Sequence, residues 1–160
     1  MSTVINANHV ETSRPETSLE ANGQAVSGLQ VRLADARERL TRLNPKVATY
    51  ATDFVEILLK FADAIATSDM HLQPTLSGTD IRCRHDGVLQ KLGEFPAGTN
   101  SSVVSRLKVL SNLLTYQSDV PQEGRIALPG EAAEVRVSTF PTLYGERAVL
   151  RFFGRGSRLK

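Results

Sequence analysis

The sequence has few of the residues that would support disulfides, zinc sites or a membrane segment. It contains one cysteine, Cys83, and no tryptophan. An internal disulfide and a cysteine-rich zinc site are therefore excluded, and a single thiol is typical of a reducing, cytosolic compartment. No apolar run approaches the ~20 residues that cross a bilayer, and the N-terminus lacks the basic and apolar regions of a signal peptide. We expect a protein that is neither secreted nor membrane-spanning.

Motifs of catalytic sites are missing as well. The sequence has no G-x-x-x-x-G-K-[ST] phosphate loop, no G-x-S-x-G elbow and no H-E-x-x-H pair. His71 and His85 stand beside Asp69 and Asp86 on predicted strands, where neighbouring side chains point to opposite faces. We therefore expect no catalytic residue and no metal site in this chain.

Length and charge narrow the class of protein. The chain has 160 residues, 41% of them hydrophobic, and a net charge of +2, which fits one domain with a tail and argues against a protein that coats nucleic acid. Five basic residues lie in the last fourteen positions, namely Arg147, Arg151, Arg155, Arg158 and Lys160. They could prefer an anion or simply form a solvated strand edge.

Composition divides the chain into four segments. Residues 1–25 are rich in Ser, Thr, Asn and Glu and predict a disordered tail. In residues 26–46, apolar side chains recur at spacings of three and four, which predicts an amphipathic helix or linker. It has fewer than three heptads, so an autonomous coiled coil would be marginal and packing on a partner domain is an equal alternative. Residues 47–155 form the predicted domain, and residues 156–160 begin a linker.

The predicted domain has an α+β order of elements. A wide apolar stripe running to about residue 67 predicts a helix packed on the core, and a further helix is expected from Asn100, with Arg106 and Lys108 facing outward. Alternation predicts six strands, at residues 70–73, 81–85, 88–92, 125–128, 134–140 and 146–153. Asp86 and Gly87 both tolerate positive φ and predict a hairpin between two of them. Helices packed on a largely antiparallel sheet are therefore expected.

Four arginines are candidates for binding phosphate. Arg82 and Arg84 are two apart on one predicted strand and share a face, Arg125 opens another strand, and Arg136 lies within a third. A guanidinium on a rigid strand suits phosphate because its planar fork matches two oxygens and stays charged. The alternative is that these arginines face water, paired with nearby carboxylates: Glu123, Glu134 or Asp86.

Six short segments carry recognisable motifs. In order, they are S-D-M-H-L-Q-P at 68–74, I-R-C-R-H-D-G-V-L at 81–89, V-S-R-L-K-V-L at 104–110, P-Q-E-G-R at 121–125, V-R-V-S-T at 135–139 and Y-G-E-R-A-V-L-R at 144–151. These resemble the S-D-I-H-I-E-P, R-x-R-x-D-G-V-L, V-S-R-I-K-V-M, P-Q-D-G-R, V-R-V-S-T and G-E-x-x-V-[LM]-R segments of the type II secretion and type IV pilus assembly ATPases, the secretion E-protein family.

The resemblance implies a fold and a role. Residues 47–155 would be the PAS-like domain that precedes the P-loop ATPase domain in this family, and the chain would be a fragment or a gene product that lacks its motor. By similarity, Arg125 and Arg136 would reach the phosphates of ATP bound on the ATPase domain, with Arg82 and Arg84 as weaker candidates. ATP and Mg are implied for the full-length family and no cofactor for this chain alone.

Partners follow from the same resemblance. They would be the P-loop domain, neighbouring subunits of a hexamer and the inner-membrane platform of a secretion or pilus machine, with no nucleic acid. The location would be cytoplasmic or peripheral to the inner membrane. Which machine is served stays open.

The chain departs from the family pattern at three places. Gln73 replaces a glutamate, Glu123 replaces an aspartate, and residues 117–120 lack a basic pair that often precedes the proline. The third departure leaves the polar contacts of that loop open. Two other functions remain as alternatives: a free-standing PAS-like ligand-sensing or interaction module, and a nucleic-acid binder, which the placement of Phe152 and Phe153 on opposite strand faces disfavours.

Overall fold

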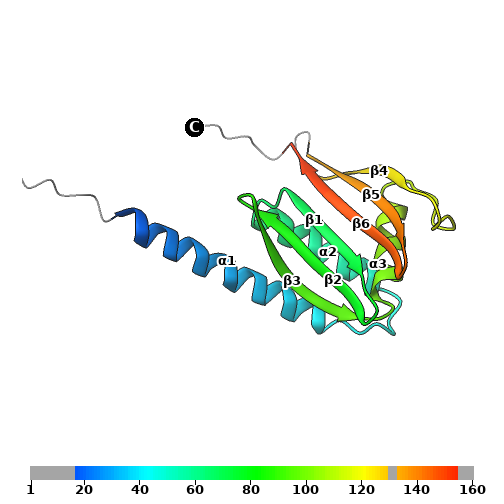
Figure 1. Cartoon of the computed structure of the whole chain (residues 1–160), viewed down its shortest axis with the longest axis horizontal. Helices are drawn as coiled ribbons and strands as arrows, with labels where there is room; N and C mark the ends of the chain where they lie inside the picture. The colour runs from blue at the N-terminus through cyan, green and yellow to red at the C-terminus, as the bar shows by residue number, and fades with distance from the viewer. Residues whose placement is uncertain (1–16, 130–132, 155–160) are drawn as a thin grey trace, which may run out of the picture.

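A computed structural model describes residues 17–129 and 133–154, with side chains from residue 28 onward (Figure 1). Residues 1–16 of the tail predicted at 1–25, and the linker predicted at 156–160, lie outside the described residues. The elements are α1 (Thr17–Thr41), α2 (Tyr50–Ala64), β1 (Asp69–Pro74), β2 (Gly78–His85), β3 (Val88–Pro96), α3 (Thr99–Leu110), β4 (Gln122–Ala127), β5 (Glu134–Thr142) and β6 (Gly145–Phe153).

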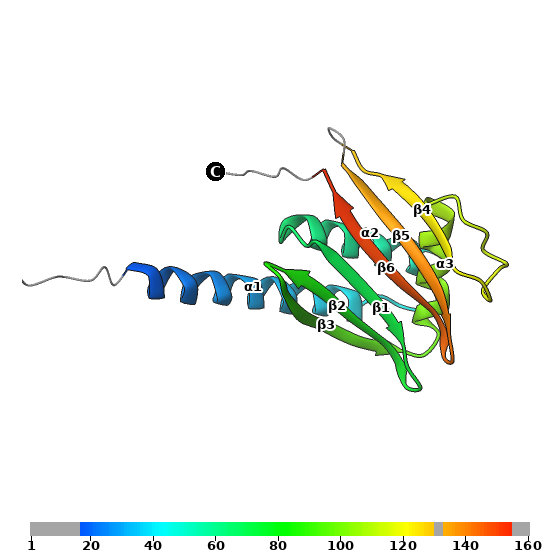
Figure 2. The same ribbon diagram turned by 45° about the horizontal axis from the view of Figure 1, so that its top comes forward.

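The sheet consists of two antiparallel meanders joined side by side. Its strand order is β3-β2-β1-β6-β5-β4, and every neighbouring pair is antiparallel (Figure 2). The first meander is β1 to β3, the second is β4 to β6, and α3 connects them. Strands β1 and β6 meet at the centre, so residues about eighty apart in sequence become neighbours. The predicted α+β class and antiparallel sheet are confirmed, and the PAS-like assignment stays a prediction.

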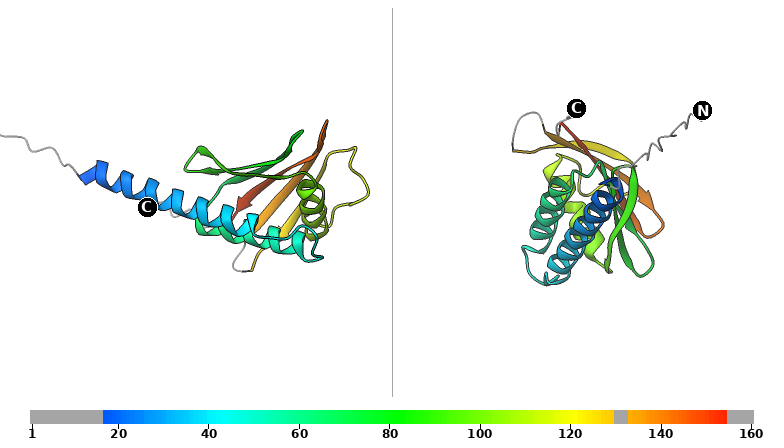
Figure 3. Two further views of the ribbon diagram at one scale, coloured as in Figure 1. Left: turned by 90° about the horizontal axis from the view of Figure 1, so that it is seen from below. Right: turned by 90° about the vertical axis from the view of Figure 1, so that its left-hand side faces the viewer.

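The three helices lie on one face of the sheet and leave the other face uncovered (Figures 1 and 3). Helix α2 packs on both α1 and α3. Alternation along each strand places one set of side chains toward the helices, among them Leu72 of β1 and Leu150 of β6, which are fully buried. Phe54 of α2 is also fully buried and contacts the rings of Tyr50 and Phe95. The core therefore occupies the layer between sheet and helices.

Helix α1 begins earlier than predicted. It starts at Thr17, so residues 17–25, which composition placed in a disordered tail, are helical. This stretch has no proline, and a helix nucleated further along the chain extends through its Leu, Glu, Gln and Ala residues despite the weaker helix formers Asn22 and Gly23. The apolar stripe is buried at Leu33, Ala36 and Leu40, where α1 packs on α2 and β3 of the same chain.

Helix α2 begins a few residues after residue 47, where the predicted domain starts. The Asn44 side-chain oxygen accepts a hydrogen bond from the Lys46 amide at 3.0 Å. This turn competes with helix formation, and α2 begins at Tyr50. The predicted hairpin is present, since Asp86 and Gly87 both have positive φ, 46° and 77°.

The prediction that Lys108 of α3 faces outward is wrong. Its side chain is fully buried, and its Nζ lies 2.5 Å from a carboxylate oxygen of Glu146 and 2.6 Å from the carbonyl oxygen of Gln117. Lys108 lies four residues after buried Val104, on the helix face that meets the sheet. Its charge is balanced inside the fold rather than by water.

Candidate functional site

A row of charged side chains crosses the uncovered face of the sheet. Cross-strand pairing places Arg84 beside Asp69, Asp69 beside Arg151, Arg151 beside Arg136, and Arg136 beside Arg125. The row spans five of the six strands because directly opposed residues share a face. Three of the four predicted phosphate-binding arginines therefore lie in a single row.

Asp69 is the central anion of this row. One carboxylate oxygen accepts a hydrogen bond from Arg151 at 2.8 Å, and the other lies 3.9 Å from Arg84. Partial burial of the carboxylate opposes its ionisation, but hydrogen bonds from Arg151 and Ser68 outweigh burial and lower the pKa of Asp69. Asp69 therefore stays ionised and links the two meanders.

Arg125 and Arg136 share one carboxylate. Glu134 lies 3.7 Å from Arg125 and 3.3 Å from Arg136, so the pairing considered in the alternative interpretation is present for both. The arginine side chains nevertheless remain 67% and 41% exposed, and Arg136 also lies 4.6 Å from the centre of the Phe153 ring. One carboxylate between two guanidinium groups leaves a positive charge that an external anion can balance.

Arg82 lies one row away. It pairs with Asp80 at 2.7 Å, and Lys91 approaches the same carboxylate at 3.5 Å. Its cross-strand neighbour on β1 is His71. All four predicted arginines thus share the uncovered face, but Arg82 belongs with His71 rather than with Arg125 and Arg136.

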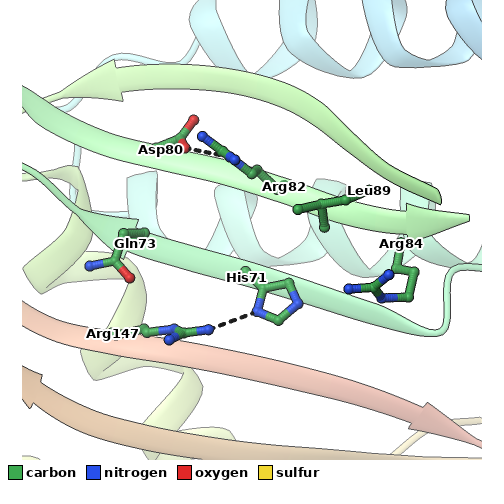
Figure 4. A pocket seen from close by; sticks show the side chains of 7 residues that line it. All are labelled: His71, Gln73, Asp80, Arg82, Arg84, Leu89 and Arg147. Atoms are coloured by element: carbon green, nitrogen blue, oxygen red, sulfur yellow. Dashed lines mark hydrogen bonds and ion pairs between the residues drawn. The ribbon is translucent and has the colours of Figure 1, made fainter. Parts of the chain in front are cut away.

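Two hollows open on this face and meet at a contact between His71 and Arg147. The first hollow is lined by residues of β1, β2, β3 and β6, including Arg82 and Arg84 (Figure 4). The second lies toward β4 and β5 and includes Arg136. Both hollows are lined by His71 and Arg147.

The contact between His71 and Arg147 determines the protonation of the imidazole. A terminal guanidinium nitrogen of Arg147 lies 3.2 Å from Nδ1 of His71. Since arginine only donates, Nδ1 must accept, and the ring is neutral with its proton on Nε2. Burial, and next the charge of Arg147, lower the pKa of His71. His71 is therefore a neutral donor through Nε2 at physiological pH.

Sequence reasoning missed His71, Asp69, Arg147 and Arg151 as parts of this face. The sequence placed Arg147 and Arg151 in a basic cluster near the C-terminus and in the motif at 144–151, without relating them to the other arginines. Their spacing of four on one strand gives them a common face, which was the available signal. Arg155, Arg158 and Lys160, in the same basic cluster, lie outside the described residues.

Gly124 explains how the P-Q-E-G-R motif positions Arg125. A Cβ at Gly124 would lie 2.3 Å from the carbonyl oxygen of Ser111, at the end of α3. Only glycine lets β4 approach the helix this closely. The glycine thus brings the strand that carries Arg125 onto the core.

Within residues 17–129 and 133–154, no three histidine, cysteine, aspartate or glutamate side chains gather as a metal site would require. His85 and Asp86 do meet, at 3.3 Å, although adjacent strand positions were expected to diverge, because Asp86 belongs to the turn. Over the same ranges, no helix has both the length and the apolar character that a membrane crossing needs.

Comparison with known proteins identifies a family and similar proteins within it. Residues 48–158 match the family described as Type II/IV secretion system protein. The type IV pilus assembly ATPase TfpB of Acinetobacter baylyi is 34% identical over 148 residues, which cover 90% of this chain and 24% of that protein. A type II secretion system protein E of Xanthomonas campestris pv. campestris is 37% identical over 103 residues, 63% of this chain and 18% of that protein.

A solved structure described as the pilus retraction motor PilT with bound ADP has a TM-score of 0.46 at 19% identity, over 62% of this chain and 29% of that chain. Against the two proteins matched by sequence, this chain spans about a quarter of their length or less.

Proposed function

Since this chain belongs to the family of type II/IV secretion system proteins, we propose that it is a non-catalytic regulatory and interaction region of a type II secretion or type IV pilus assembly ATPase. In this proposal Arg125 and Arg136 face ATP, with its Mg ion, bound on a separate P-loop domain. The chain itself supplies cations and a moving surface, and hydrolysis belongs to the P-loop domain.

The observation that carries the proposal is the position of the motif arginines. Arg125 and Arg136 come from two different motifs, yet they are direct cross-strand neighbours on the uncovered face. Both side chains are exposed and share a single carboxylate, Glu134. Two guanidinium groups held side by side on a rigid sheet suit the oxygens of a terminal phosphate.

The proposed mechanism is stabilisation of charge across a domain boundary. Negative charge on the phosphoryl group in transfer is stabilised by cations that are fixed before the reaction begins. If Arg125 and Arg136 belong to one rigid body and the nucleotide to another, the contact forms only when the two bodies close. Nucleotide state is then coupled to rigid-body motion.

The proposed partners follow from the family. They are the P-loop domain, the neighbouring subunits of a hexamer, and the inner-membrane platform proteins of a secretion or pilus machine. The chain would act in the cytoplasm, peripheral to the inner membrane. Motion of the sheet and its helices would be transmitted to that platform.

The role of the arginines is testable in a chain that includes the P-loop domain. Arg125→Ala or Arg136→Ala should lower kcat by roughly a hundredfold, as expected for the loss of a preorganised transition-state contact. The melting temperature should stay unchanged because both side chains are exposed. A matched control is Arg42→Ala, which removes an exposed arginine directly after α1 whose partner is Glu38. Wild-type turnover in the Arg125, Arg136 double variant would contradict the proposal.

The non-catalytic character is tested separately on this chain. Purified and supplied with ATP and Mg, it should release phosphate no faster than a heat-inactivated sample. Turnover that persists through repurification would show that an active site exists in these 160 residues.

The ligand-sensing alternative has no comparable support. It requires room for an apolar ligand between sheet and helices. That layer is filled by buried side chains, including Phe54, Leu107 and Leu150. The hollows that carry charge lie on the opposite, uncovered face.

A further inference from the structure

The hollow around Arg82 and Arg147 contains more positive charge than the fold balances. Around it stand five cations and three carboxylates: Arg82, Arg84, Arg147, Arg151 and Lys91 against Asp69, Asp80 and Glu94. The carboxylates are engaged in ion pairs, so an excess of two positive charges remains. The arginines that line the hollow come from both meanders, Arg82 and Arg84 from β2 and Arg147 from β6 (Figure 4).

Arg147 is the arginine in this hollow that lacks an anion. Within residues 17–129 and 133–154 it forms no ion pair with a carboxylate, and its buried Nε donor has no hydrogen-bond partner. Its contact is His71, a neutral acceptor. A partly buried guanidinium without an anion is unfavourable, so an incoming anion would gain a charge-assisted hydrogen bond here.

Other donors converge on the same space. The Nε2 proton of His71 is available because Nδ1 is engaged with Arg147. Arg82 uses Nε for Asp80, and Arg84 uses one terminal nitrogen for the Gly87 carbonyl oxygen. The remaining guanidinium N–H groups of Arg82 and Arg84 can still donate, since each guanidinium has five.

We propose that the hollow lined by His71, Arg82, Arg84 and Arg147 binds a phosphate-class dianion. Two negative charges balance the excess of two, whereas a single carboxylate would leave one cation unbalanced. A tetrahedral oxyanion also offers enough acceptors for three guanidinium groups and one imidazole N–H. The bound anion would bridge β2 of the first meander to β6 of the second.

This site is separate from the proposed contact with ATP. Arg125 and Arg136 do not line the hollow, and the contact between His71 and Arg147 separates it from the hollow that contains Arg136. The inference goes beyond the proposed function, because the site would bind its anion whether or not Arg125 and Arg136 act on nucleotide.

The test is titration of the full 160-residue chain with inorganic phosphate. Sodium chloride holds the ionic strength constant, and NMR follows the His71 ring, assigned with His71→Gln. Phosphate should shift the His71 resonances saturably and raise the melting temperature, because a ligand of the native state stabilises it. Arg147→Gln and, as a second variant, Arg82→Gln should each weaken binding roughly tenfold or more.

The matched control is Arg42→Gln, which removes an exposed arginine that does not line the hollow and should bind phosphate as the wild type does. Circular dichroism establishes that each variant is folded. The proposal is overturned if phosphate causes no saturable shift, or if folded Arg147→Gln and Arg82→Gln both bind like the wild type.

A second titration with ATP identifies the source of the anion. Competition with phosphate for His71 assigns the hollow to a nucleotide phosphate, and absence of competition assigns it to free phosphate; both support the site.

Discussion

Removing one partner of the buried ion pair between Lys108 and Glu146 should strongly destabilise this domain. The Lys108 side chain is fully buried and that of Glu146 is 12% exposed, with 2.5 Å between nitrogen and oxygen. Lys108→Met keeps the aliphatic bulk and removes the ammonium group. The carbonyl oxygen of Gln117 stays satisfied by the Gln122 side chain at 2.8 Å, so the cost arises mainly from the uncompensated Glu146 carboxylate.

Removal of one partner of a buried pair costs roughly 3–5 kcal/mol. A domain of this size has a total stability of about 5–15 kcal/mol, so a large share would be lost. With about 2–4 °C of melting temperature per kcal/mol, we expect a decrease of roughly 10 °C. Thermal and urea unfolding, both followed by far-UV circular dichroism, are the assays, because the chain has no tryptophan for fluorescence.

A matched control and a double variant sharpen the test. Lys60 and Glu56 also lie 2.5 Å apart, but their side chains are 66% and 56% exposed, so Lys60→Met should leave the urea midpoint within error. Lys108→Met combined with Glu146→Met removes both charges and should recover much of the loss. The reasoning is refuted if Lys108→Met unfolds at the wild-type midpoint, or if the double variant loses the sum of the two single losses.

Three further predictions concern the buried ring of Phe54, the carboxylate of Asp69 and the thiol of Cys83. Phe54→Ala should cost roughly 3–5 kcal/mol in urea unfolding, because the ring is fully buried against Tyr50 and Phe95; a change below the error of the fit would place α2 outside the core. Hydrogen bonding in the fold lowers the pKa of Asp69, so its stabilisation is complete above the unfolded pKa of about 3.8 and is lost as pH falls through the folded value. In Asp69→Asn, the free energy of unfolding should therefore fall less steeply as the pH is lowered through the acid range than it does in the wild type. An unchanged dependence on pH contradicts this role. Burial raises the pKa of the Cys83 thiol to about 11, so iodoacetamide at pH 8 should label the native chain far more slowly than the urea-unfolded chain; equal rates would show that the thiol is accessible.

Local pattern was sufficient for most of the elements. Alternation around Arg82 and Arg84 predicted a strand with both arginines on one face, and Asp86 and Gly87 predicted the hairpin that follows. These features depend on a few consecutive residues, whose steric preferences act without the rest of the chain. Motif order likewise indicated the family to which residues 48–158 belong.

The burial of a charged residue that lies on an apolar helix face was predicted less well than the elements were. Lys108 was assigned to the outer face of its helix because lysine usually contacts water. Its burial depends on Glu146, which lies on β6, and on Gln117 in a loop. A partner that distant in sequence cannot be identified from helical periodicity.

The amino-acid sequence by itself determined the elements, the α+β class and the presence of arginines in strands, because these depend on local sterics and on the alternation of apolar side chains. Only the tertiary structure decided which arginines stand together. Pairing of β1 with β6 places Asp69 beside Arg151 and His71 near Arg147, and strand order depends on the packing of the whole chain. Electrostatic interaction falls off with distance, so the charge balance of the uncovered face exists only once the two meanders have joined.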